Sequence, residues 1–261
     1  MDLLPAIELI AREAGIAIMS FYHQQRSIVE KEDGSPLTDA DTAAHHFIVS
    51  ALKTLAPSIH ILSEESVPDF SEPNKDGFYW LVDPLDGTKE FISCNDEFTV
   101  NIALIENGHP ILGVVYAPAL NVIYSARKGF GSYKQNDGSM RKRIGEIHRE
   151  FGKRNIKIVS SRSHADEKLQ VWLKKFESYE TITMGSSLKF CLVAEGLADV
   201  YPRFGPTCFW DTAAAQCVVE EAGGSVLDLN GFSLTYHLNK PYLNPSFIAF
   251  GDQEKRMLFF S

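Results

Sequence analysis

Two stretches near the N-terminus carry apolar residues at helical spacing. In residues 3–22, apolar positions such as Ile7, Ile10 and Ala14 recur every three or four residues, which predicts an amphipathic helix. A second helix is expected to begin after Thr38, because threonine is a favourable N-cap. The chain is therefore predicted to start with two helices.

The following part consists of short runs rich in apolar and β-branched residues, which are typical of strands. The predicted strands are residues 59–63, 78–83, 99–106, 111–117 and 122–126. Turn-forming residues separate the last three runs, so residues 98–126 are predicted to form a meander of neighbouring antiparallel strands.

The C-terminal part alternates between strand and helix patterns. The predicted strands are residues 156–160, 199–201 and 247–250, and the predicted helices are residues 165–176, 186–196 and 211–222. We therefore divide the chain into an N-terminal α+β half, residues 1–135, and a C-terminal α/β half, residues 155–261.

The stretch between the two halves, residues 136–154, is polar and contains six basic side chains: Arg141, Lys142, Arg143, Arg149, Lys153 and Arg154. We interpret it as a linker or surface loop. A solvated loop is favoured over a nucleic-acid site, although this basic stretch is the one feature that would support binding of RNA or a protein partner.

The composition is that of a globular protein, with 44% hydrophobic and 23% charged residues among 261 positions. Lys and Arg number 25 and Asp and Glu number 34, which gives a net charge of −9. An acidic chain is a poor general binder of nucleic acid, because neutralising phosphates needs clustered cations. We expect no stable nucleic-acid complex, whereas an anionic small molecule is compatible if cations bridge it to the protein.

The location of the protein is predicted from its termini, apolar runs and cysteines. The N-terminus lacks the basic region of a secretory signal, and the apolar runs are too short to cross a bilayer. Cys94, Cys191, Cys208 and Cys217 form no CxxC pair and are interpreted as reduced, buried thiols. These features predict a cytoplasmic protein without a transmembrane segment; peripheral contact with the inner face of the membrane is left open.

The strongest chemical signal follows the apolar run Trp80-Leu-Val, where the sequence continues Asp-Pro-Leu-Asp-Gly-Thr. Asp83, Asp86 and the carbonyl of Leu85 could all be offered from one tight corner at the end of a strand. Oxygen ligands of this kind suit Mg²⁺ or Mn²⁺ better than zinc. Asp-Pro or Asp-Gly alone would indicate an ordinary turn, but the two together after a strand indicate a metal site.

Two further acidic segments are ambiguous when taken alone. Glu64 and Glu65 follow a predicted strand, and adjacent strand residues point to opposite sides, so both cannot face one ion. A surface acid pair is the alternative. Asp211 opens a predicted helix rich in alanine, where it is either the N-cap or a distant carboxylate that reaches the same metals.

Taken together, these segments resemble the lithium-sensitive, magnesium-dependent phosphatase superfamily that includes inositol monophosphatase and fructose-1,6-bisphosphatase. Its signature is E-E, D-P-x-D-G-T and W-D-x-A-A, matched here in order by segments starting at Glu64, Asp83 and Trp210. The resemblance covers nearly the whole chain except residues 136–154. Lys89-Glu90 and the runs 97–104, 113–118, 160–164, 185–190 and 201–207 are similar to its bisphosphate nucleotidase branch, although Ala215 replaces an expected glycine.

The resemblance implies a role for each matched residue. Two Mg²⁺ ions, or three, would be bound, the first by Glu64, Asp83 and the Leu85 carbonyl and the second by Asp83, Asp86 and Asp211, with Glu65 outside the ligand set. Thr88 and Asp41 match the pair that activates the attacking water. The implied substrate contacts are Gly87, Thr88, Ser161, His164, Ser186, Lys189 and Asp211, with Arg203 as a weaker addition.

The resemblance also implies a fold and an activity. The fold would be a layered α/β/α/β/α sandwich of the inositol monophosphatase and fructose-1,6-bisphosphatase type, in a monomer or a homodimer. The reaction would be hydrolysis of the 3′-phosphate of adenosine 3′,5′-bisphosphate (PAP) to AMP and phosphate, with its sulfated relative PAPS as a second substrate. The role would be recycling of a by-product of sulfate assimilation, and lithium should inhibit. An inositol or fructose phosphatase is the alternative within the same fold.

Overall fold

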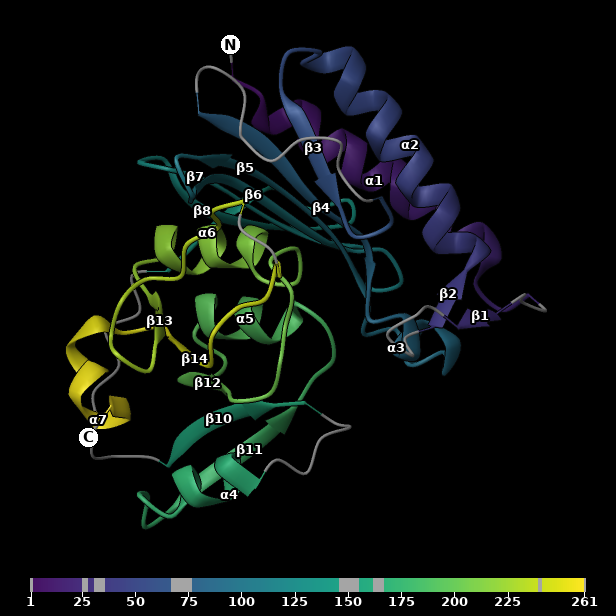
Figure 1. Cartoon of the computed structure of the whole chain (residues 1–261). Coiled ribbons are helices and arrows are strands. Elements are labelled where there is room, and N and C mark those ends of the chain that lie inside the picture. Colours follow the sequence, from purple (N-terminus) through teal and green to yellow (C-terminus); the bar gives the residue numbers. More distant parts are fainter. Residues whose placement is uncertain are drawn as a thin grey trace.

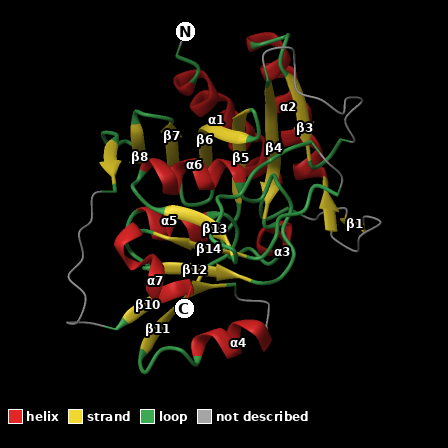
Figure 2. Cartoon of the chain, turned by 60° about the vertical axis from the view of Figure 1, so that its left-hand side comes forward, coloured by secondary structure: helices red, strands yellow, loops and turns green. Residues whose placement is uncertain are grey.

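The computed structural model describes residues 2–24, 28–30, 36–66, 77–145, 155–161, 167–238 and 241–260. Two large sheets and the helices form five layers in the order α/β/α/β/α (Figures 1 and 2). Helices α1 (Leu4–Phe21) and α2 (Asp39–Leu55) cover the outer face of the larger sheet. The layered sandwich implied by the sequence resemblance is confirmed.

The larger sheet has seven strands that follow one another in chain order. They are β3 (His60–Ser63), β4 (Phe78–Asp86), β5 (Thr99–Glu106), β6 (His109–Ala117), β7 (Val122–Arg127), β8 (Gly131–Asn136) and β9 (Lys142–Ile144). Only the β3–β4 pair is parallel, and the others are antiparallel, so the predicted meander is confirmed. Because β3 and β4 run in the same direction, their carboxyl ends, and the acidic residues there, lie side by side.

The smaller sheet has five strands in the order β11-β10-β12-β14-β13. They are β10 (Ile156–Ser160), β11 (Tyr179–Thr183), β12 (Val200–Arg203), β13 (Ser225–Asp228) and β14 (Phe247–Phe250). Helix α4 (Glu167–Leu173) and helix α7 (Arg256–Phe260), which follows the short 3₁₀ helix η1 (Gln253–Lys255), pack on its outer face through an apolar cluster that includes Trp172 and Phe259.

Helices α5 (Leu188–Ala194) and α6 (Ala213–Glu221) form the middle layer between the two sheets (Figure 1). Small residues let α6 lie directly on the larger sheet. A Cβ atom at Gly113 of β6 would come within 2.2 Å of the carbonyl oxygen of Ala214, so this contact requires glycine. The close packing fixes the turn before α6, which carries Asp211, against the larger sheet.

The start of α2 is as the sequence predicts, with Thr38 at the N-cap. Asp41, at the third helical position, accepts a hydrogen bond from the Thr38 backbone N–H at 2.8 Å. The strand β2 (Pro36–Thr38), which pairs with β1 (Ile28–Glu30), leads directly into this helix. The carboxylate of Asp41 is thereby held at the carboxyl end of a strand and the start of a helix.

Several elements differ from the sequence prediction. Part of the stretch 136–154, expected as a loop, forms β9 and completes the larger sheet, while residues 146–154 lie outside the described residues. The sequence also missed β1, β2, β8, β11, β13, the short helices α3 (Thr88–Ile92) and α7, and the 3₁₀ helix η1. Helix α5 begins two residues later than expected, because Ser186 has a left-handed backbone with φ of 54°.

Two predictions about the whole chain can be compared with the structure. None of the helices in the described residues is long and apolar enough to cross a membrane. Cys191 and Cys217 are buried, but Cys208 is half-buried and Cys94 is exposed, so the prediction of four buried thiols is wrong for these two. Cys94 follows α3, a helix that the sequence analysis did not anticipate.

Candidate active site

The larger sheet and the turn before α6 bring three carboxylates together. Asp83 and Asp86 lie at the carboxyl end of β4, where the pairing with β5 shifts register between them. Asp211 approaches from the turn that precedes α6. The three residues each offer an oxygen within 4.8 Å of the other two. Residues 128 positions apart in the sequence thus form one acidic cluster.

Asp83 is buried and Asp86 and Asp211 are half-buried, and the cluster is electrostatically unfavourable without a cation. Burial, reinforced by the carboxylates of Glu64, Asp86 and Asp211, raises the pKa of Asp83 well above its usual value. Burial and the nearby Asp86 likewise raise the pKa of Asp211. A bound divalent cation would remove this repulsion, so the donor set and its charge fit a hard metal ion coordinated by oxygen.

Glu64 joins the cluster from β3. Its backbone N–H donates to the carbonyl of Val82 at 3.1 Å, which continues the parallel pairing of β3 with β4. A side-chain hydrogen bond with Glu64 contributes to the raised pKa of Asp83, so these two carboxyl groups are in direct contact. Glu64, the member of the acid pair that the resemblance implied as a ligand, therefore lies beside Asp83.

Asp41 and Thr88 form a second polar pair at the edge of this cluster. The hydroxyl of Thr88 donates to Asp41 Oδ1 at 3.1 Å and lies 3.3 Å from the carbonyl oxygen of Leu85. The other oxygen, Asp41 Oδ2, accepts from the backbone N–H and the hydroxyl of Thr38 at 2.8 and 2.5 Å. Asp41 thus both supports the start of α2 and orients the Thr88 hydroxyl. Gly87, with φ of 92°, makes the turn that starts α3 at Thr88.

The C-terminal half holds Asp86 through one of its two oxygens. Asp86 Oδ2 accepts from the hydroxyl of Ser186 at 2.7 Å, from the backbone N–H of Ser187 at 2.7 Å and from the Ser187 hydroxyl at 2.9 Å. These contacts join the two halves directly beside the acidic cluster. They also satisfy Oδ2, which makes Oδ1 of Asp86 the oxygen suited to a metal.

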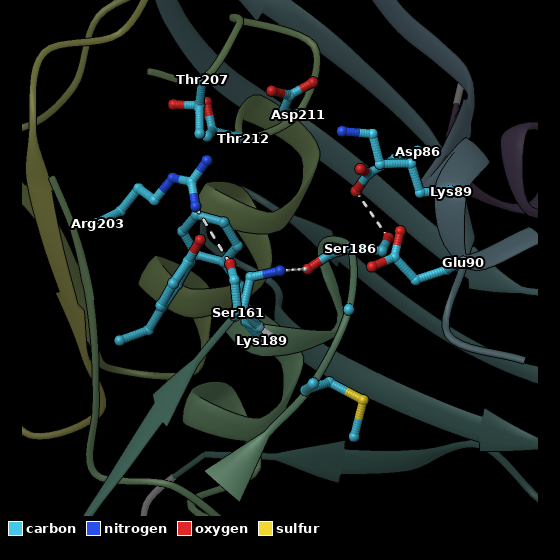
Figure 3. A pocket seen from close by; sticks show the side chains of 15 residues that line it. Asp86, Lys89, Glu90, Ser161, Ser186, Lys189, Arg203, Thr207, Asp211 and Thr212 are labelled. Atoms are coloured by element: carbon cyan, nitrogen blue, oxygen red, sulfur yellow. Dashed lines mark hydrogen bonds between the residues drawn. The ribbon is translucent and has the colours of Figure 1, made fainter. Parts of the chain in front are cut away.

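A cleft opens beside the cluster. Its walls come from both halves, and Figure 3 shows Asp86 and Asp211 facing Lys189 and Arg203 across it. Lys189 donates to the carbonyl of Ser186 at 2.7 Å, and burial lowers the pKa of its ammonium to about 8. Arg203 donates to the hydroxyl of Ser161 at 3.2 Å. The cleft therefore has carboxylates of the acidic cluster on one side and the cations Lys189 and Arg203 on the other, with Lys89 and Glu90 also in its lining.

Six of the eight substrate residues expected from the sequence line this cleft, and Thr88 follows the lining residue Gly87 and contacts Asp41 instead. The six that line the cleft are Gly87, Ser161, Ser186, Lys189, Arg203 and Asp211. His164 lies outside the described residues. Asp211 does not open α6 as expected, because Thr212 is the residue before the helix and Asp211 Oδ2 instead accepts from the N–H of Cys208 at 2.8 Å.

Comparison with known proteins decides the family. The sequence model of the inositol monophosphatase family matches residues 2–256. The chain belongs to this family. Among its relatives, the 3′(2′),5′-bisphosphate nucleotidase CysQ of Escherichia coli K12 is 51% identical over 240 residues, which cover 91% of this chain and 95% of that protein. The protein of the same name from Buchnera aphidicola is 45% identical over 251 residues, 95% of this chain and 93% of that protein.

Solved structures agree with the family assignment. The crystal structure of CysQ from Bacteroides thetaiotaomicron, a bacterial member of the inositol monophosphatase family, matches with a TM-score of 0.81 and 39% identity. The match covers 95% of this chain and 96% of that chain. An IMPase from Thermotoga maritima matches with a TM-score of 0.82 at 25% identity, over 99% and 96% of the two chains. The inositol monophosphatase fold therefore extends over the whole described chain.

Three polar residues that the sequence analysis did not single out support the site of this family member. The hydroxyl of Ser187 lies 2.7 Å from the carbonyl oxygen of Asp211 as well as 2.9 Å from Asp86, and it accepts from Asn101 at 2.9 Å. Glu97 accepts from the backbone N–H of Gly185 at 2.8 Å. Ser187 and Glu97 lie in runs that resemble the nucleotidase branch, but no local pattern showed that they bridge the two halves.

Proposed function

We propose that this protein is a Mg²⁺-dependent phosphatase that hydrolyses the 3′-phosphate of adenosine 3′,5′-bisphosphate to give AMP and phosphate, and that it also acts on PAPS. The observation that carries the proposal is a cleft with a carboxylate cluster on one side and Lys189 and Arg203 on the other. A substrate with two phosphate groups fits this division of charge. The bisphosphate nucleotidases that are 51% identical to the chain support the same substrate class.

The carboxylates are assigned to metal binding. Glu64, Asp83 and the carbonyl of Leu85 would hold one Mg²⁺ ion, and Asp83, Asp86 and Asp211 a second. Bound Mg²⁺ would supply positive charge that acidifies the attacking water and stabilises the departing oxygen. The raised pKa values of Asp83 and Asp211 are consistent with this assignment, because they show that the protein alone leaves the negative charge of the cluster uncompensated.

Asp41 and Thr88 are assigned to activation of water. Since the Thr88 hydroxyl donates to Asp41 at 3.1 Å, its lone pairs are free to accept a hydrogen bond from a water in the cleft. The water attacks phosphorus in line with the 3′-oxygen, its proton passes through Thr88 to Asp41, and the bond from phosphorus to the 3′-oxygen breaks. The departing 3′-oxygen takes up a proton from solvent water to complete AMP, and Asp41 returns the proton that it accepted to solvent.

The basic side of the cleft is assigned to the second phosphate. Lys189 and Arg203 offer an ammonium and a guanidinium, and the hydroxyl of Ser161 is held by Arg203 at 3.2 Å. Ser186 was expected to contact substrate, but its hydroxyl donates to Asp86 and its carbonyl accepts from Lys189. We infer that Ser186 mainly orients these two charged residues. His164 stays a predicted contact.

Phosphate release from four substrates tests the proposal. PAP, PAPS, inositol 1-phosphate and fructose 1,6-bisphosphate would each be assayed with Mg²⁺, in the presence and absence of Li⁺. We expect strong preference for the two nucleotides and inhibition by millimolar lithium. Preference for inositol or fructose phosphate would retain the metal site but overturn the assignment of the basic side. No turnover of any substrate would contradict the proposed function.

The titration of Lys189 gives a prediction for substrate binding. With a pKa of about 8, its ammonium loses charge as the pH rises from 7 to 9, so the KM for PAP should rise about tenfold over this range. The variant Lys189→Arg stays charged and should show a nearly flat KM. Initial rates at saturating Mg²⁺ across this pH range measure both. An equal rise of KM in wild type and variant would exclude Lys189 as the titrating group.

The remaining assignments follow from the same proposal. We propose two Mg²⁺ ions at turnover, with a third left open, in a cytoplasmic enzyme that is a monomer or a homodimer. Analytical ultracentrifugation distinguishes these two oligomeric states. Three of the six basic side chains in the stretch that could have supported RNA binding are described, namely Arg141, Lys142 and Arg143, and the other three lie outside the described residues.

A further inference from the structure

The turn that carries Asp211 is paired with a loop more than thirty positions later in the sequence. The loop of residues 241–246 precedes β14 and runs antiparallel to the turn. The backbone N–H of Phe209 donates to the carbonyl of Tyr242 at 3.0 Å, and the N–H of Asn244 donates to the carbonyl of Thr207 at 2.9 Å. The position of Asp211 is thus tied to a loop outside its own helix.

The side chain of Asn244 makes the densest polar contacts in this pairing. Its amide nitrogen lies 2.7 Å from the carbonyl oxygen of Cys208, 3.0 Å from the hydroxyl of Thr212 and 3.2 Å from the hydroxyl of Thr207. Turning the amide over would place its oxygen against the Cys208 carbonyl, so the chemistry of the partners fixes the nitrogen in this place. The amide oxygen is buried and has no hydrogen-bond partner in the described part of the chain. The amide nitrogen of Asn244 is therefore the end of the side chain that holds the turn.

These contacts lie on both sides of Asp211. Cys208 opens the turn, and its N–H donates to Asp211 Oδ2 at 2.8 Å, while its carbonyl accepts from the Asp211 N–H at 3.3 Å. Thr212 follows Asp211, and its hydroxyl lies 3.0 Å from the hydroxyl of Tyr236, which in turn donates to buried Gln216 at 2.6 Å. Asn244 thus connects the start of the turn to a buried hydrogen-bond network at its end.

We propose that Asn244 is a positioning residue for the metal site, acting by holding the Cys208–Thr212 turn so that the carboxylate of Asp211 meets those of Asp83 and Asp86. The inference rests on the metal site of the proposed function and deepens it. Asn244 does not line the cleft, although its partners Thr207 and Thr212 do, and the proposed effect on substrate runs through metal affinity. Residues that orient a metal ligand in this way typically change metal affinity by about 10- to 100-fold.

Calorimetric titration of the metal-free protein with Mn²⁺ tests the proposal. The variant Asn244→Ala should bind Mn²⁺ at least about tenfold more weakly than wild type. Saturating Mg²⁺ should restore its kcat, with the KM for PAP within twofold of wild type. Asn244→Asp keeps the size of the side chain but loses the donor, and it should behave like Asn244→Ala. The matched control is Asn230→Ala, at an exposed asparagine in the turn after β13.

A double variant separates positioning from general support of the fold. In the Asp211→Asn background the ligand is already impaired, so adding Asn244→Ala should weaken Mn²⁺ binding by less than twofold more. Unchanged Mn²⁺ affinity in Asn244→Ala, or an undiminished further loss in the double variant, would overturn the proposal. Because Mn²⁺ titration needs no substrate, this result stands apart from any failure of the nucleotide assays.

Discussion

Asp83→Asn is expected to lower kcat by roughly 10³-fold or more, which corresponds to a loss of about 4 kcal/mol of transition-state stabilisation. Asp83 is the buried member of the acidic cluster, has a side-chain hydrogen bond with Glu64, and offers an oxygen within 4.8 Å of those of Asp86 and Asp211. It is assigned to both metals, so its loss removes a shared ligand. Phosphate release from PAP and Mn²⁺ titration measure the two effects.

The same substitution should stabilise the metal-free protein. Burial and neighbouring carboxylates raise the pKa of Asp83. At pH values above the usual carboxyl pKa, the folded state therefore binds more protons than the unfolded state. The free energy of unfolding of the metal-free wild type therefore falls as the pH rises from about 4 toward neutrality. Asp83→Asn should remove part of this decrease in the free energy of unfolding. Added Mg²⁺ should reverse the decrease in the wild type only.

Thermal unfolding at pH 5 and pH 7, with EDTA or with Mg²⁺, measures the effect on stability. This effect is expected to be opposite in sign to the effect on activity. Asp137→Asn, which neutralises an exposed carboxylate far from the cluster in the sequence, is the control for net charge. Activity of Asp83→Asn within a few-fold of wild type would show that the proposed metal site is wrong. A lower melting temperature of the metal-free variant at pH 7 would contradict the electrostatic account.

Thr88→Val is the second substitution with a large expected effect. It keeps the shape of the side chain but removes the hydroxyl that donates to Asp41 at 3.1 Å. Since positioned proton transfer contributes about 10²- to 10⁴-fold, kcat should fall by about 10²-fold or more. Mn²⁺ affinity should stay within a few-fold, because no carboxylate of the cluster is removed.

The conservative variant and a second substitution make this prediction specific. Thr88→Ser retains the hydroxyl and should keep most of the activity. Asp41→Asn should lower kcat to a similar extent, and the double variant should be little worse than either single one, because the two residues act as a unit. Thr88→Val is the cleaner probe, since Asp41 also accepts hydrogen bonds from Thr38 at the start of α2. Near-normal kcat of Thr88→Val would contradict the water-activating role.

The sequence pattern predicted the elements whose hydrophobic spacing is set locally. Helices α1 and α2 and the β5–β7 meander were found close to their predicted bounds, because each has a continuous buried face. Strand β11 was missed, since four of its five residues are exposed and it carries no apolar run. The starts of α5 and α6 were misplaced for two reasons. Ser186 lies in a turn whose partner, Asp86, is distant in the chain, and Asp211 accepts a hydrogen bond from Cys208 within its own turn.

The sequence by itself determined the acidic residues of the site, their order along the chain and the family to which they point. These features depend on residues that are close in the sequence. Asp83 and Asp86 lie at the end of one strand, and Asp41 lies in the first turn of one helix. Only the tertiary structure decided that Glu64 contacts Asp83, that Ser187 bridges Asp86 and Asp211, and that Asn244 holds the Asp211 turn. Such contacts and the raised pKa values arise from burial and from partners brought together by folding, which no local pattern encodes.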